Sequence, residues 1–373
     1  MSVKRTAVYP FNDEFSYYLN HSDLIAEYDV VSVISSKGSG FEGIPVCLGE
    51  KEIIVTEDFD NEVQHCDCVI VLFYDRPFES PLSEQEHNNR RQKNNKILIE
   101  KCKQIALLGK EIVCVSKQME VINALEKYIP AKQLTIFKTP NILDHRISGL
   151  QSINTPVVFI TSLFEGLGKS DLMLYIYKHL KSYDAKVCCI SARSDISLFG
   201  GVYMDCFSSS YELSTSHILS INAYLKELEM NNDYDLFLVD VPGGCIPFSK
   251  EAPIDFGLTF FSYCKAIYPD YTILLLPFSN TVGGKANELK GIVEKGFGVE
   301  IDDYIISNKA VVYQESILNT KVMTISLNKY YMTEEENKYY EEQGNCNDFE
   351  KNISSAVDKM VLVLNKYGEI NKV

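Results

Sequence analysis

The stretch from Pro156 to Leu180 reads PVVFITSLFEGLGKSDLMLYIYKHL. Its first part, Val157 to Thr161, is apolar and predicts a buried strand, and the sequence from Lys169 onward predicts an amphipathic helix. Between them lie Gly166, Leu167, Gly168, Lys169 and Ser170. Glycines let the backbone wrap an anion, a helix N-terminus presents free N–H groups, and lysine adds a positive charge. We therefore expect Gly166, Gly168, Lys169 and Ser170 to contact the phosphate groups of a cofactor.

This loop matches the phosphate-binding pattern G-x-x-x-x-G-K-[ST] in part. Gly168, Lys169 and Ser170 agree with it, but Leu163 stands at the position of the first glycine. The alternative interpretation is an ordinary turn before a helix that begins with Gly-Lys-Ser. The strand before the loop and the helix after it favour phosphate binding, because the pattern requires both.

The composition describes an ordinary globular protein. A length of 373 residues predicts two or three domains, and 46% hydrophobic with 23% charged residues is enough to build a core. The net charge of −15 disfavours binding to nucleic acid, which needs a basic face. We expect no nucleic-acid partner.

The cysteines and the first residues bear on localisation. The chain has 11 cysteines, an odd number, and its opening residues MSVKRTAVYPF lack the apolar core of a secretion signal. No apolar run approaches the roughly 20 residues of a membrane span. We expect a cytoplasmic protein with reduced cysteines and no membrane association.

Strands and helices alternate along the chain, which predicts an α/β fold with two parallel-sheet domains. Residues 1–140 predict a Rossmann-like domain, although it lacks the dinucleotide pattern G-x-G-x-x-G. Residues 141–155 predict a linker, and residues 156–373 a P-loop NTPase-like domain with a charged helical tail. Within the first domain, the polar segment from Asp75 to Asn95 predicts an exposed loop that precedes a helix from Lys96.

A second motif lies about 70 residues after the loop. The apolar strand DLFLVD ends at Asp240 and is followed by Val241, Pro242, Gly243 and Gly244. An aspartate in this position is typical of a Walker B element, which holds Mg²⁺ directly or through water. We expect Ser170 and Asp240 to bind the metal. We expect Gly243, Gly244 and Asp195, which follow neighbouring strands, to contact the cofactor.

Both motifs together resemble the P-loop NTPases of the class that contains MinD, ParA and dethiobiotin synthetase, over the second domain. The resemblance implies ATP or GTP with Mg²⁺, with Lys169 on the phosphates, Ser170 on Mg²⁺ and Asp240 supporting the metal. This chain departs from the MinD-like pattern, because Phe164 and Glu165 stand where that pattern has lysine and glycine. The departure puts hydrolysis in doubt more than binding.

The whole chain resembles peptide maturation system proteins, which are encoded beside radical SAM maturases of ribosomally made peptides. The similar segments are AVYPF at 7–11, the K-G-x-G turn at 37–40, IIVTEDF at 53–59, LFG at 198–200 and PGG at 242–244. The resemblance implies an accessory role in natural-product maturation, with a modified precursor peptide or its maturase as partner.

Two alternatives stay open. The chain also resembles two-domain proteins of which some look like acetyl-CoA-dependent N-acetyltransferases, so the loop could hold the pyrophosphate of CoA in an acyltransferase. It could also be a non-catalytic scaffold with a decayed P-loop. No catalytic triad is predicted, because the candidate residues are scattered along the chain: Ser191, Ser194, His179 and His217. The sequence therefore assigns no catalytic residue. A homo-oligomer is a further possible assembly.

Overall fold

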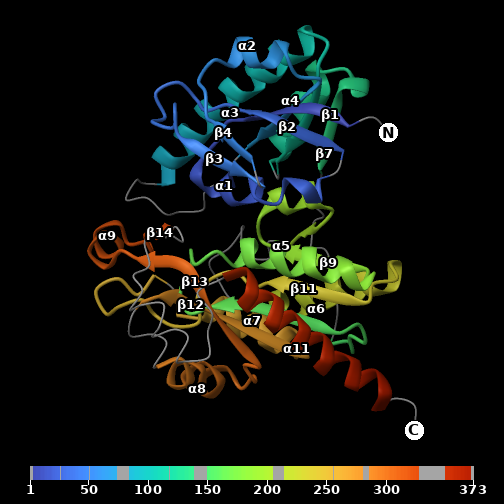
Figure 1. Cartoon of the computed structure of the whole chain (residues 1–373), viewed down its shortest axis with the longest axis vertical. Helices are drawn as coiled ribbons and strands as arrows, with labels where there is room; N and C mark the ends of the chain where they lie inside the picture. The colour runs from blue at the N-terminus through green and yellow to red at the C-terminus, as the bar shows by residue number, and fades with distance from the viewer. Residues whose placement is uncertain are drawn as a thin grey trace. The chain divides into compact units, whose positions relative to one another are not determined.

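The computed structural model describes residues 3–25, 27–49, 51–73, 84–116, 118–137, 149–204, 214–254, 256–279, 285–326 and 349–370. The chain divides into two compact units (Figure 1). The first comprises Met1–Pro140 with Arg193–Tyr203, and the second Asn141–Ala192 with Met204–Val373. Residues 193–203, which the sequence analysis placed in the second domain, thus belong to the first unit. Both units are α/β, which confirms the predicted fold class.

The first unit contains a parallel sheet with the strand order β2-β1-β5-β6-β7. Numbering these five strands along the chain gives the order 2-1-3-4-5, which is a doubly wound arrangement. An antiparallel hairpin, β3–β4, accompanies it. The elements are β1 (Lys4–Tyr9), α1 (Asp13–Leu19), β2 (Tyr28–Val33), β3 (Pro45–Leu48), β4 (Lys51–Ile54), α2 (Phe59–Gln64), β5 (Cys68–Leu72), α3 (Glu84–Leu107), β6 (Glu111–Val115), α4 (Met119–Tyr128) and β7 (Leu134–Phe137).

Helix α3 is longer than the sequence pattern predicts. It begins at Glu84, so the part of the predicted loop from Glu84 to Asn95 is helical, and residues 74–83 lie outside the described residues. The segment is rich in glutamate, glutamine, lysine and arginine, which favour helix, and lacks proline and glycine. Asn89 and residues 91–94 are exposed, whereas Asn95 is buried and Leu98, Cys102 and Ile105 anchor the later turns in the core.

The second unit contains a sheet in which the strands of this unit lie in the order β9-β11-β8-β12-β13-β14. All are parallel except β14, which pairs antiparallel with β13 at the edge. The elements are β8 (Val157–Ser162), α5 (Lys169–Leu180), β9 (Val187–Ser191), α6 (Thr215–Asn231), β11 (Leu236–Asp240), α7 (Leu258–Ala266), β12 (Tyr271–Phe278), α8 (Ala286–Phe297), β13 (Asp303–Val311), α9 (Tyr313–Asn319), β14 (Thr324–Ser326) and α11 (Phe349–Ile370).

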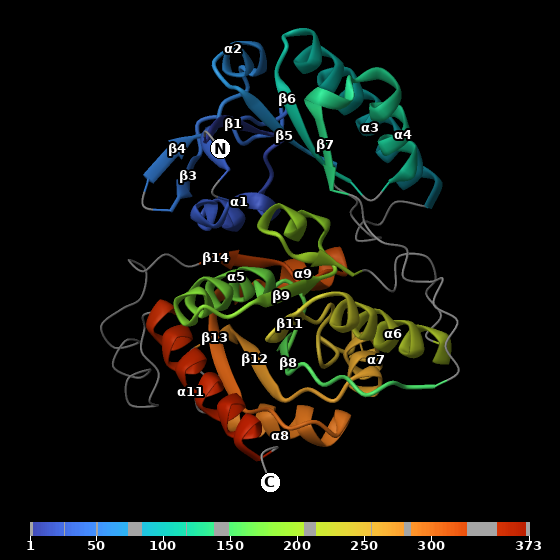
Figure 2. The same cartoon turned by 90° about the vertical axis from the view of Figure 1, so that its right-hand side faces the viewer.

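Helices cover this sheet in two groups. Helices α5 and α11 pack together, with α5 against β9 and β11 and α11 against β13, while α6 packs on α7 (Figure 2). Helix α11 buries Ile353, Ala356, Val357 and Met360, which recur at intervals of three and four residues and form one apolar face. The predicted helical tail is therefore in part the α11 helix on the sheet; residues 327–348 lie outside the described residues.

Strand β8 lies between β11 and β12. All its residues are buried, as expected for a central parallel strand. In open parallel sheets, ligands bind beyond the carboxyl ends of the strands, where the strand order reverses direction. The loop after β8 occupies that position. No helix among the described residues is long and apolar enough to cross a membrane.

Candidate phosphate-binding site

The loop between β8 and α5 is held in shape by backbone contacts and glycines. The N–H of Leu163 donates to the carbonyl of Leu275 in β12 at 2.9 Å, which ties the first loop residue to the sheet. Gly166 and Gly168 have φ of 84° and 92°, a left-handed conformation that favours glycine. Gly168 forms the N-cap of α5, and its carbonyl accepts the first helical hydrogen bond from Leu172 at 3.0 Å.

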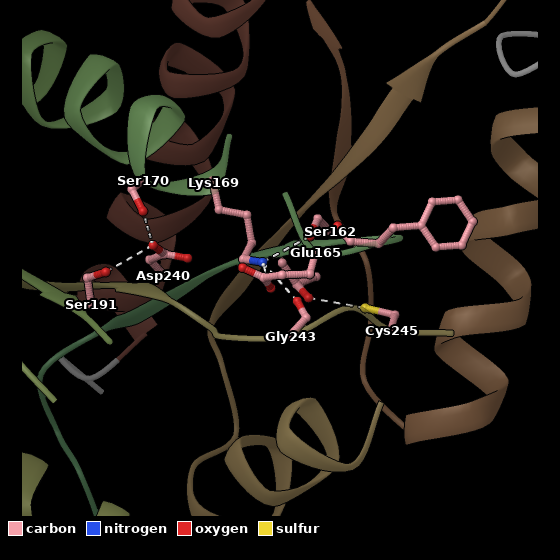
Figure 3. Close-up of polar contacts among 10 residues, drawn as sticks. Ser162, Glu165, Lys169, Ser170, Ser191, Asp240, Gly243 and Cys245 are labelled. Atoms are coloured by element: carbon pink, nitrogen blue, oxygen red, sulfur yellow. Dashed lines mark hydrogen bonds and ion pairs between the residues drawn. The ribbon is translucent and has the colours of Figure 1, made fainter. Parts of the chain in front are cut away.

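The side chain of Lys169 folds against this loop and is 5% exposed. Its Nζ is 2.8 Å from Oε2 of Glu165, 2.8 Å from the carbonyl of Gly243 and 3.1 Å from Oγ of Ser162 (Figure 3). Burial is the largest influence and lowers the pKa of Lys169. The charges of Glu165 and Asp240 and the hydrogen bond with Glu165 together outweigh it, so the pKa is raised above its ordinary 10.5. Lys169 therefore stays cationic at neutral pH.

Asp240, at the end of β11, accepts hydrogen bonds from two hydroxyl groups. Its Oδ2 accepts hydrogen bonds from Ser170 Oγ at 2.5 Å and from Ser191 Oγ at 3.0 Å (Figure 3). Ser191 ends β9 and lies in register with Asp240 on the neighbouring strand. Burial raises the pKa of Asp240, while Lys169 and the two hydroxyl groups act in the opposite direction; the net shift is upward from 3.8.

The turn after Asp240 packs directly under the loop. A Cβ on Gly244 would lie 2.9 Å from the carbonyl oxygen of Leu163 and 2.9 Å from the Cα of Phe164, so this position has room only for glycine. The N–H of Cys245 donates to the carbonyls of Ser162 at 3.0 Å and Leu163 at 3.1 Å. The Pro-Gly-Gly turn and the loop therefore form one hydrogen-bonded assembly.

Asp195 belongs to the first unit, whereas the residues of this assembly belong to the second. Its buried carboxylate pairs with the guanidinium of Arg193, with 2.6 Å between Arg193 Nη2 and Asp195 Oδ2. Arg193 in turn lies over the ring of Tyr18, 5.1 Å from its centroid, and Tyr18 stacks on Phe199. The contact of Asp195 with a cofactor stays a prediction.

The oxygen atoms of Ser170 and Asp240 fit Mg²⁺. Mg²⁺ prefers hard oxygen ligands and is usually held by one or two protein groups together with phosphate and water. The serine hydroxyl and the carboxylate are adjacent, and both are buried beside the helix N-terminus. Within the described ranges no group of three or more His, Cys, Asp or Glu residues could hold a metal ion. A metal here would thus depend on the phosphate ligand.

Sequence reasoning missed several residues of the assembly. Ser191 is predicted to take no part in a catalytic triad and carries no other predicted role, but its hydroxyl group donates a hydrogen bond to Asp240. In the sequence, Glu165 stands out only as a departure from the MinD-like pattern. In the structure its carboxylate forms an ion pair with Lys169, four residues later. Glu165 lies in the turn before α5, so the i, i+4 rule for ion pairs on helices does not apply, and the sequence carried no signal for this contact. Ser162, the last residue of β8, carried none.

Comparisons with known proteins add a likeness in fold. No family model and no curated protein matches this chain. Among solved structures, a DUF1611 family protein from Anabaena variabilis matches with a TM-score of 0.54 at 12% identity, over 95% of this chain and 99% of that one. The chain thus shares its two-unit α/β fold with that protein.

Two structures of MinD from Aquifex aeolicus also match, one of them in complex with MinC. The alignments cover 51% of this chain and 78% and 79% of those chains, at 16% and 17% identity, with TM-scores of 0.29. These scores are too low to define a shared fold.

Proposed function

We propose that the second unit binds a phosphate-bearing ligand, a Mg²⁺-nucleotide, at the loop 163–170. The observation that carries this proposal is the meeting of Lys169, Ser170 and Asp240 at the carboxyl end of β8, where the order of the strands reverses. Lys169 is cationic and lies at the first turn of α5, whose free N–H groups also attract anions.

Each group has a defined task in this proposal. The phosphate oxygens replace the Glu165 carboxylate as partners of the Lys169 ammonium group. Ser170 and Asp240 hold Mg²⁺, which when bound would neutralise charge on the phosphates. Ser191 orients Asp240 through its hydrogen bond of 3.0 Å. This set binds and positions a ligand, and it contains no group that we assign as a base for hydrolysis.

Calorimetry with ATP, GTP and their diphosphates, each with and without Mg²⁺, tests the proposal. Lys169→Met keeps the aliphatic stem but removes the charge, and we expect it to abolish binding. Lys178→Met is the matched control, because Lys178 is exposed on the same helix α5 and its replacement removes the same charge. Nucleotide binding by Lys169→Met with the affinity of the wild type would contradict the proposal.

A CoA-dependent acyltransferase is the second candidate, and Glu165 is the observation that favours it. The carboxylate of Glu165 is about half exposed beside Lys169 and opposes additional negative charge at the loop. A pyrophosphate ligand such as CoA suffers less from this repulsion than a triphosphate. CoA binding that does not depend on Mg²⁺ would favour this candidate, and a strict dependence on Mg²⁺ would contradict it.

We further propose an accessory role in the maturation of a ribosomally made peptide in the cytoplasm. Support comes from the resemblance of the short segments described above and from the nine described cysteines, which form no disulfide bond with one another. The test is direct titration of the purified protein with the modified precursor peptide and with its maturase. Failure to bind either partner would contradict this role. If the wild type binds neither nucleotides nor CoA, the non-catalytic scaffold with a decayed P-loop is favoured instead.

A further inference from the structure

Strand β13 has an irregularity next to the loop. Leu276 of β12 pairs with Ile306, but Phe278 pairs with Ala310, so residues 307–309 of β13 lie opposite Pro277 alone. Proline has no N–H to donate to a neighbouring strand. The pairing is broken at this point, and β13 bulges there. Bulges near functional sites often redirect side chains.

Ser307 connects the bulge to the loop. Its buried Oγ donates to the carbonyl of Leu167 at 2.7 Å and accepts from the backbone N–H of Lys309 at 3.1 Å. One hydroxyl group therefore fixes both the backbone of the loop and the backbone of the bulge. The position of Lys309 relative to the loop is set by this contact.

The side chain of Lys309 passes beside Gly168, the residue before Lys169. A Cβ placed on Gly168 would lie 3.4 Å from Cε and 3.8 Å from Nζ of Lys309. A second ammonium group thus lies close to the backbone of the loop, although Lys309 comes from a strand that is two positions away from β8 in the sheet. Lys309 is partly exposed, so solvent and ligand can reach it.

The charges of the loop indicate why a second cation matters. Lys169 is the only cation of the set built around Asp240, and it faces the carboxylates of both Glu165 and Asp240. These three groups carry a net negative charge when all are ionised, which disfavours an anionic ligand. The positive charge of Lys309, which comes from β13, offsets that negative excess. A ligand with two phosphates has enough oxygen atoms to contact both lysines.

We infer that Lys309 is a second phosphate-binding residue, which contacts the diphosphate group shared by nucleotides and CoA. This inference rests on the proposed function of the loop. The lysine makes charge-assisted hydrogen bonds to phosphate oxygens, and the bulge at 307–309 places it there. Lys309 thus binds the phosphate groups of the ligand and has no assigned role in a chemical step.

Calorimetry with inorganic diphosphate, ADP with Mg²⁺, and CoA compares the wild type with Lys309→Met and Lys309→Arg. Loss of a charge-assisted hydrogen bond should weaken binding about tenfold or more in Lys309→Met, and Lys309→Arg should retain most of the affinity. Lys309→Met should also bind with a weaker dependence on salt than the wild type, because one ionic contact is missing. A merely structural role would not change that dependence.

Lys265→Met is the matched control, because Lys265 is exposed on α7 in the same unit and its replacement changes the net charge equally. If the wild type binds and Lys169→Met does not, while Lys309→Met binds like the wild type, this inference is wrong and the proposed function stands. If the wild type binds none of the three ligands, both are wrong. If Lys309→Met loses affinity for both diphosphate and CoA while the wild type does not bind ADP, the inference holds and CoA is the source of the diphosphate.

Discussion

The hydroxyl group of Ser170 donates a hydrogen bond of 2.5 Å to Asp240, although 70 residues separate them in the chain. Ser170 belongs to the first turn of α5, and Asp240 ends the strand beside β8. Ser191 reaches the same carboxylate oxygen from the next strand. Asp240 therefore joins one helix N-terminus and two strand ends, which makes it the residue on which the geometry of the site depends.

The first prediction concerns Asp240 and pH. Burial, the largest influence, raises the pKa of Asp240 in the folded protein. A raised pKa means that protonation favours the folded state, so this stability is fully present below the unfolded value of about 3.9 and is lost as the pH rises through the folded pKa. The free energy of unfolding of the wild type relative to Asp240→Asn should therefore fall as the pH rises above about 4, through the raised pKa of the folded protein. Urea unfolding of both proteins measures it, and a constant or rising difference would contradict the assignment.

The second prediction concerns Glu165, whose carboxylate competes with phosphate for the Lys169 ammonium group. Glu165→Gln removes the negative charge and keeps the shape, so affinity for diphosphate should increase several-fold. Isothermal titration of inorganic diphosphate measures the change. Glu315→Gln is a suitable control, because Glu315 is exposed on α9 of the same unit and its replacement removes the same charge. Equal or weaker binding by Glu165→Gln would show that the ion pair does not restrain the lysine.

The third prediction compares two glycines of the second unit. Gly244→Ala brings a Cβ to 2.9 Å from backbone atoms of Leu163 and Phe164, which cannot rotate away. The clash should cost about 1–3 kcal/mol of stability and weaken ligand binding, since the loop must shift. Gly291→Ala, inside α8 with open space around it, should stabilise by about 0.5–1 kcal/mol. Urea unfolding distinguishes the two, and similar effects for both would refute the packing argument.

The fourth prediction concerns the cysteines. Burial raises the pKa of Cys66 to about 11 and that of Cys68, Cys114, Cys188 and Cys264 to about 12, whereas Cys47 is exposed. Alkylation requires the thiolate, so among these six residues iodoacetamide at about pH 8 should modify Cys47 first. Peptide mapping by mass spectrometry gives the order. A guanidinium-unfolded sample is the control, in which all six should react; early modification of Cys188 or Cys264 would contradict their burial.

Local patterns were sufficient for part of the fold. The apolar run from Val157 to Thr161 predicted β8 to within one residue, and Gly-Lys-Ser predicted the start of α5, because strand burial and helix N-terminal chemistry act over a few neighbouring residues. They were insufficient for α3, which begins at Glu84 within a stretch that polarity alone suggested was a loop. Exposed helices carry little hydrophobic periodicity, so their boundaries are poorly visible in the sequence.

The sequence by itself determined the α/β alternation and the loop with Lys169 and Ser170, since these depend on short-range spacing. Only the tertiary structure decided which distant groups meet that loop. Strand order and register brought Ser191 to Asp240, and the bulge opposite Pro277 brought Lys309 to Gly168. The physical reason is that register and bulges arise from pairing between strands, which no single segment encodes.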